Sequence, residues 1–138
     1  MTQLDAWAPR VLSILRIMTA LLFIAHATTK FFGFPTVMPG PLPGIIVVAG
    51  VIELVTGALI ALGLFTRPAA FLASGTMAAA YFMGHAPQSF WPIVNQGETA
   101  IMFCFVFFYL VFAGPGSWSL DAVIRGRGND SATPTTYR

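Results

Sequence analysis

The sequence predicts an all-α integral membrane protein, a bundle of four transmembrane helices. Two observations support this class. Hydrophobic residues make up 57% of the 138-residue chain and charged residues only 9%, whereas a soluble domain carries about 25% charged residues. The apolar residues also fall into four long segments, separated by stretches rich in proline and glycine. Because so few charges cannot cover a surface that faces water, we expect much of the chain to face lipid.

The apolar segments have the lengths that membrane-spanning helices need. A spanning helix takes about 20 residues, with a range of roughly 17–25, and helices satisfy their own backbone hydrogen bonds in lipid. The sequence lacks the apolar and polar alternation that a membrane β-barrel requires. The predicted spans lie at about residues 11–32, 44–65, 69–85 and 93–113. We therefore assign residues 1–124 to one transmembrane domain.

The chain changes character after the fourth predicted span. Leu120, Val123 and Ile124 recur at helical spacing, which predicts a short interfacial helix with one apolar face. Residues 125–138 are mostly small, polar or charged, a composition typical of disorder. We expect a disordered tail there.

The basic residues predict which side of the membrane each end faces. Cytoplasmic loops carry an excess of Lys and Arg. Lys30 lies alone at one end of the predicted bundle, whereas the other end and the tail carry five arginines: Arg10, Arg67, Arg125, Arg127 and Arg138. We therefore predict that both termini, including the tail, are cytoplasmic.

Charged residues inside the predicted spans are the strongest indication of a function. A charge at mid-bilayer costs at least about 2.5–3.5 kcal/mol, so each charge needs a partner, water or a route to the interface. At a rise of about 1.5 Å per residue, Arg16 and Glu53 are expected to differ in depth by roughly 8 Å in a hydrocarbon core about 30 Å thick, a distance that a long arginine side chain can mostly bridge. We predict a buried ion pair between them, which either serves a function or fixes helix packing.

A second group of polar residues is expected at the outer end of the bundle. His26 and Lys30 are four residues apart and therefore share one face of the first span. His85 ends the third span and Glu98 begins the fourth, with Asn95 just before it. We predict that these five residues converge beneath the outer surface as a candidate polar site, with Glu53 deeper below them.

These residues also have structural interpretations. Lys30 could extend to the lipid headgroups, and His85 could lie in the interface. Asn95 and Glu98 could form a capping box, with Asn95 as the N-cap and Glu98 three residues later. His26 has no obvious local partner, so it is the hardest of the group to explain by structure alone.

The predicted polar site suits a quinone head group better than a metal. Histidine exchanges protons near neutral pH, and Phe31, Phe34, Phe90 and Trp91 would supply apolar walls. The sequence holds no HxxxH or HExxH motif for a metal or haem. The single Cys104 cannot form an intrachain disulfide, and a net charge of +2 from scattered basic residues does not indicate nucleic-acid binding.

Several short motifs, taken in their order and spacing, resemble the DoxX family of small bacterial membrane proteins. The matching residues are Arg16, His26, Lys30-Phe31-Phe32-Gly33, Glu53, Gly57, Gly63-Leu64-Phe65-Thr66-Arg67, Asn95-Gln96-Gly97-Glu98, Gly114-Pro115-Gly116 and Ser119-Leu120-Asp121. The similarity spans about residues 10–121. One departure is the stretch Ala27-Thr28-Thr29, where the family often has a glycine.

The resemblance implies a four-helix protein of the bacterial inner membrane. Some family members are linked to thiosulfate:quinone oxidoreduction as membrane subunits, and others to oxidative-stress complexes with soluble redox partners. We therefore expect a membrane subunit or anchor of a redox system, at most quinone-binding, with a quinone as the candidate cofactor. Two alternatives stay open: a non-enzymatic scaffold that recruits soluble partners, and a small-molecule or proton-coupled transporter that works as a homodimer.

Overall fold

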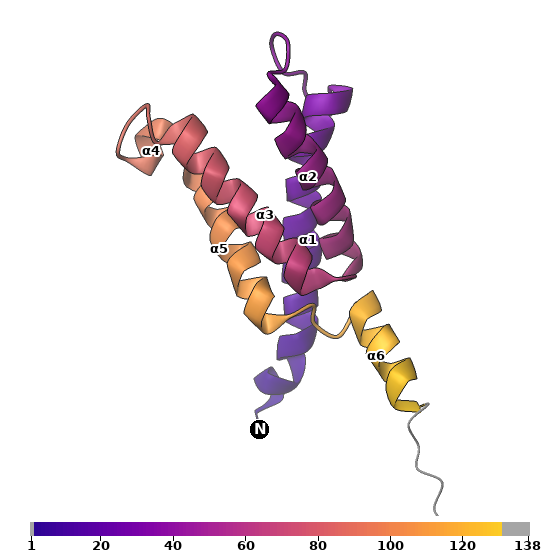
Figure 1. Ribbon diagram of the computed structural model, residues 1–138. Helices are drawn as coiled ribbons and strands as arrows, with labels where there is room; N and C mark the ends of the chain where they lie inside the picture. Colours follow the sequence, from indigo (N-terminus) through magenta and orange to yellow (C-terminus); the bar gives the residue numbers. More distant parts are fainter. Residues whose placement is uncertain (1, 131–138) are drawn as a thin grey trace, which may run out of the picture.

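The computed structural model describes residues 2–130, and every regular element in this range is helical (Figure 1). The elements are α1 (Gln3–Phe32), α2 (Gly44–Leu62), α3 (Thr66–Ala80), the π-helical η1 (Tyr81–His85), α4 (Pro92–Asn95), α5 (Glu98–Ala113) and α6 (Leu120–Asp130). The prediction of an all-α chain is therefore confirmed for the described residues.

Two helices within residues 2–130 are long and apolar enough to cross a membrane. The best windows of α1 and α2 reach mean hydropathies of 1.8 and 2.6. α5 is also apolar but has only 16 residues, and α3 has 15 residues before it runs on into η1. The four-helix transmembrane bundle as a whole therefore stays a prediction.

Two helix boundaries differ from the predicted spans because local polar groups start or stop the helix. α1 begins well before residue 11, because the Thr2 side chain accepts a hydrogen bond from the Asp5 amide and completes a capping box. The predicted fourth span is broken at Gln96, which has a left-handed φ of 60°. The Asn95 side chain accepts a hydrogen bond from the Gly97 amide at 2.8 Å and closes this turn.

The C-terminal helix starts where the sequence predicts but runs further. The Ser119 hydroxyl accepts a hydrogen bond from the Ala122 amide at 3.1 Å, a typical N-terminal cap. α6 then continues to Asp130, so residues 125–130 of the predicted tail are helical. Residues 131–138 lie outside the described part of the chain.

The helices pack as two pairs that diverge toward one end. α1 lies along α2 and α3 lies along α5, while α2 and α3 meet near the tight turn between them (Figure 1). We call the end with the α2–α3 turn the narrow end, and the end with the α1–α2 loop and α4 the wide end. The rings of Phe23 and Phe107 meet edge to face at 4.7 Å, and they join α1 to α5 in the core.

Arg16 closes the narrow end. Its side chain is only 1% exposed, and the guanidinium donates hydrogen bonds to the backbone carbonyls of Pro115, Trp118 (2.7 Å) and Ala61 (3.5 Å). Gly63 makes room for this contact, because a Cβ there would lie 2.8 Å from Arg16 Nη1. The chain segment after α5 is therefore fastened to α1 and to the end of α2. We call this cluster the Arg16 junction.

The predicted Arg16–Glu53 ion pair is wrong. The backbone carbonyls after α5 accept no hydrogen bond within a helix. The Arg16 guanidinium donates to them at the narrow end. Glu53 instead accepts from Lys30 at the wide end. The estimated depths allowed an ion pair between Arg16 and Glu53. They did not show toward which end of its helix each side chain extends.

Asp121 and Arg67 complete the narrow end. The Asp121 carboxylate accepts from the backbone amides of Phe65 (3.0 Å) and Thr66 (3.1 Å), at the start of α3. Arg67 Nη1 donates to the carbonyls of Val111 and Phe112 (both 2.7 Å), at the end of α5. Each helix terminus thus receives the charge that its dipole favours.

The pKa of the Asp121 carboxyl lies below its ordinary value of 3.8. Partial burial acts to raise this pKa, but the hydrogen bonds from the Thr66 and Phe65 amides and the nearby Arg125 charge outweigh it. Asp121 therefore stabilises the fold when it is ionised.

Replacement of Arg16 by methionine is expected to destabilise the protein by at least about 3 kcal/mol. Hydrogen bonds from a charged group contribute roughly 1.5–3 kcal/mol each, and the Pro115 and Trp118 carbonyls would lose their donor. Chemical unfolding in mixed detergent micelles measures the change. Arg10→Met changes an exposed residue of the same helix and is the matched control; it should cost at most about 1 kcal/mol, the contribution of the exposed contact of Arg10 with the Trp7 ring. Equal stability of both variants would contradict the role of the Arg16 junction.

Acidification is expected to remove the contribution of Asp121 to stability. Since the folded pKa is lowered, the contribution is complete above the ordinary value of 3.8 and is lost as the pH falls through the folded pKa. The difference in melting temperature between wild type and Asp121→Asn should be constant above about pH 5 and shrink below it. Thermal unfolding at a series of pH values tests this, and a difference that grows on acidification would refute it.

Candidate functional site

A cavity of about 640 Å³ opens at the wide end, between α1, α2, the α3–η1 segment and the start of α5. This volume falls within the range of roughly 300–1,000 Å³ that is usual for small-molecule sites. Four ionisable residues line it: His26, Lys30, Glu53 and His85. The structure therefore brings together His26, Lys30 and His85, which the sequence placed at the outer end, and Glu53, which it placed deeper below them.

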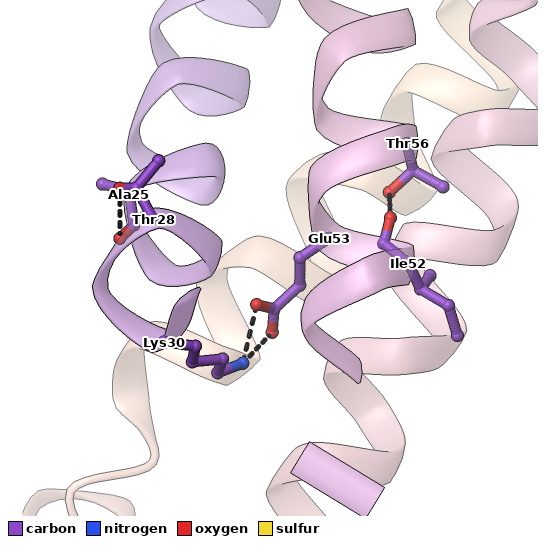
Figure 2. Close-up of polar contacts among 6 residues, drawn as sticks. All are labelled: Ala25, Thr28, Lys30, Ile52, Glu53 and Thr56. Atoms are coloured by element: carbon purple, nitrogen blue, oxygen red, sulfur yellow. Dashed lines mark hydrogen bonds and ion pairs between the residues drawn. The ribbon is translucent and has the colours of Figure 1, made fainter. Parts of the chain in front are cut away.

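Lys30 and Glu53 form an ion pair that joins α1 to α2. The Lys30 ammonium lies 2.7 and 2.6 Å from the two carboxylate oxygens of Glu53 (Figure 2). The Lys30 and Glu53 side chains are only 14% and 3% exposed. Lys30 therefore points into the protein and not, as its alternative interpretation allowed, toward the headgroups. Because both side chains are nearly buried, the loss of either charge would leave the other without compensation.

Antiparallel packing explains why Glu53 pairs with Lys30. Both residues lie near the α1–α2 loop, whereas Arg16 is roughly 20 Å farther along α1 at 1.5 Å per residue. Gly50, one turn before Glu53, lets the two helices approach. A Cβ at Gly50 would lie 2.7 Å from Phe31 Cζ and 3.4 Å from Lys30 Cδ.

His26 stands one helical turn before Lys30 and faces the cavity. Its imidazole meets the ring of Phe103 on α5 edge to face, with 5.5 Å between ring centroids. Within residues 2–130 the imidazole makes no hydrogen bond to another residue. Neither ring nitrogen is therefore engaged by the described part of the chain.

His85 is held at the cavity wall by the loop before α5. Its Nδ1 lies 2.9 Å from the Asn95 carbonyl oxygen. Asn95 itself is buried outside the cavity, where its amide donates to the Ser89 carbonyl (2.9 Å) and the Tyr81 hydroxyl (3.3 Å). Asn95 therefore positions the loop and, through its carbonyl, His85.

Glu98 does not join the site. It is exposed and does not line the cavity. The predicted capping box is also wrong, because Gly97 is the N-cap of α5 and Glu98 is its first residue. The break at Gln96 shifts the start of the helix, so Glu98 is not three residues past the cap.

The walls of the cavity differ from those that the sequence suggested. The aromatic residues expected there, Phe31, Phe34, Phe90 and Trp91, are not among its lining residues. Apolar residues of α2, α3 and α5 take their place, namely Ile45, Ile46, Val48, Ala49, Ile52, Met77, Ala79, Ala80, Ala100 and Phe103, with Met83 from η1. These residues carry no sequence signal that separates cavity lining from lipid contact, so sequence reasoning missed them.

Fold and site together define a small helical protein with a largely apolar cavity that four ionisable residues line. The DoxX family model matches residues 11–86, and the chain belongs to this family. It is 44% identical to an uncharacterised protein of Haemophilus influenzae, over 88% of this chain and 96% of the relative. It is 29% identical to an uncharacterised membrane protein of Mycobacterium tuberculosis, over 86% of this chain and 83% of the relative. No solved structure matches the chain.

Three findings indicate a membrane protein: membership of the DoxX family, the membrane-protein relative and the two apolar helices of spanning length. The chain is a membrane protein of the DoxX family. The family match confirms the resemblance to DoxX proteins that the sequence motifs indicated.

Removal of one partner from the Lys30–Glu53 pair is expected to destabilise the protein by about 3–5 kcal/mol, because the other charge stays buried without compensation. Lys30→Met and Glu53→Met are the single changes. The double variant should recover most of the loss, since no charge then remains. Glu98→Gln, an exposed carboxylate at the same end, is the control. Unfolding in detergent measures all four, and additive losses in the double variant would exclude a coupled pair.

Proposed function

We propose that this chain is a membrane subunit or anchor of a redox system, and that it holds a quinone in the wide-end cavity. The observation that carries the proposal is the convergence of His26, Lys30, Glu53 and His85 on one cavity with apolar walls. Ionisable residues at membrane depth are costly, and here they gather around a space large enough for a ligand.

The residues around the cavity fit a quinone head group. Lys30 supplies an N–H donor to a carbonyl oxygen, and Glu53 supplies an acceptor to a hydroxyl. His26 can do either, because its ring nitrogens are not engaged by any of residues 2–130. Phe103 and Met77 provide the apolar sides that a flat ring requires. When bound, a quinone supplies two-electron, two-proton redox chemistry.

His26 is suited to exchange protons at the cavity. An imidazole can accept and donate a proton through its ring nitrogens, and the Lys30–Glu53 ion pair lies one helical turn farther along α1. Electrons would come from a soluble redox protein, as the family resemblance suggests. The chain's own part is to bind, to orient and to hold protons.

We also propose a multi-pass topology in the bacterial inner membrane, with the narrow end and both termini in the cytoplasm. Arg10 and Arg67 lie toward the narrow end, which agrees with the excess of basic residues on cytoplasmic sides. α5 would span about 24 Å, slightly less than the hydrocarbon core of about 30 Å, which a locally thinner bilayer can accommodate.

α6 is proposed to lie on the cytoplasmic membrane surface. Its residues Leu120, Val123 and Ile124 are exposed at 41%, 50% and 56%, and they share one apolar face. A helix with this pattern gains free energy when it lies in the headgroup region.

The protein purified in lipid nanodiscs is expected to retain a quinone that organic extraction recovers. His26→Ala and Glu53→Gln should each weaken quinone binding at least about tenfold, a loss equal to about 1.4 kcal/mol. Glu98→Gln lies outside the cavity and should bind as wild type. Binding is measured as quinone retained above empty nanodiscs, with thermal unfolding to show that each variant is folded.

Quinone retention in nanodiscs, together with a flux measurement in proteoliposomes, separates the proposal from its alternatives. Wild-type protein that binds no quinone would overturn the proposal and favour a scaffold. Proton flux across proteoliposomes that Glu53→Gln abolishes would favour the transporter.

A further inference from the structure

The wide-end cavity has its rim among residues that face away from the protein. Ile45 and Val48 of α2 are 59% and 55% exposed, and Met83 of η1 is 65% exposed. Ala79 of α3 is also exposed, and all four line the cavity. An apolar rim at this position would meet lipid tails and not water, because α2 is the most apolar helix of spanning length in the described chain.

The Lys30–Glu53 ion pair of α1 and α2 lines the same cavity as this rim. Lys30 and Glu53 are nearly buried, and His26 faces the same space from α1. The cavity therefore joins a buried ion pair to an opening with exposed apolar side chains between α2 and the α3–η1 segment, where His85 is the ionisable residue. A buried ion pair beneath an apolar opening suits a molecule with one hydrogen-bonding end and one apolar end.

We infer that a lipid-soluble quinone reaches the cavity sideways from the bilayer, with its head group at Lys30, Glu53 and His26 and its apolar tail between α2 and the α3–η1 segment. The inference rests on the proposed function and adds the route of access and the position of the tail. It makes Gly84, on the rim, a residue that determines which ligands fit.

The π-helical turn shapes this rim. In η1 the Ala86 amide donates to the Tyr81 carbonyl at 2.9 Å, a five-residue step that widens the helix. Gly84 lies within this turn and lines the cavity, and a Cβ added there would meet nothing within 4 Å. Next to it, the contact between His85 Nδ1 and the Asn95 carbonyl holds the imidazole toward the loop. Because residue 84 is a glycine, no side chain extends from this point of the rim.

The chain supplies a matched control for a test at this rim. Gly75 lies in the middle of α3, is exposed, and also has nothing within 4 Å of an added Cβ. Unlike Gly84, it does not line the cavity. Gly84→Trp and Gly75→Trp therefore add the same bulk to the same helical segment, inside and outside the proposed path.

The test compares decylubiquinone with its tail-less dimethoxy-methyl-benzoquinone parent. Both are titrated into nanodiscs that hold the full chain, and retention is corrected with empty nanodiscs. We expect Gly84→Trp to weaken decylubiquinone binding at least about tenfold and to leave binding of the tail-less compound within about twofold, since its smaller head does not need the rim. Gly75→Trp should bind both as wild type does.

The outcomes distinguish this inference from the proposed function. Wild-type protein that binds neither quinone would refute the proposed function. Wild-type binding that Gly84→Trp leaves unchanged for decylubiquinone would refute access at this rim while the proposed function stands. An equal loss of both quinones in a folded Gly84→Trp variant would also refute the placement of the tail.

Discussion

The burial of one guanidinium, that of Arg16, holds the narrow end of this protein together. The Gly-Pro-Gly segment after α5 leaves carbonyls that no helix satisfies, and Arg16 donates to those of Pro115 and Trp118. A charge buried among carbonyls is stable only where several acceptors converge on it. Three separate stretches of the chain must therefore meet at this point: the middle of α1, the end of α2 and the segment that leads to α6. Asp121 and Arg67 reinforce the meeting by capping the start of α3 and the end of α5.

Because the helices are fastened together at the narrow end, the two helix pairs can diverge toward the wide end. The two helix pairs are fixed at the α2–α3 turn and separate toward the α1–α2 loop and α4 (Figure 1). The space between them is the cavity, and the Lys30–Glu53 pair bridges α1 and α2 beside it (Figure 2). An ion pair at this place keeps two charges in an apolar setting at a lower cost than either alone. It also leaves donor and acceptor atoms beside the space where the proposed ligand would lie.

The motifs through which the sequence resembles DoxX proteins divide between these two ends. Arg16, the Gly63–Arg67 stretch and the Gly114–Asp121 stretch build the Arg16 junction and its caps. His26, Lys30 and Glu53 line the cavity, and Asn95 holds its wall through His85. Motifs far apart in the chain thus describe two physical units, one that fastens helices and one that surrounds a space. Glu98 belongs to neither, although its motif suggested otherwise, because the break at Gln96 places it on the exposed start of α5.

The sequence by itself determined the helical class, the positions of the long apolar segments, the start of α6 and the gathering of His26, Lys30 and His85 at one end. These follow from composition and from helical periodicity, which act over a few residues. Only the tertiary structure decided the partners. Lys30 and not Arg16 pairs with Glu53, and alanines, Met77 and Phe103 rather than the loop aromatics wall the cavity. The reason is that partner choice depends on helix crossing, on the glycine contacts at Gly50 and Gly63, and on which carbonyls lack donors, and these are fixed only when distant segments pack together.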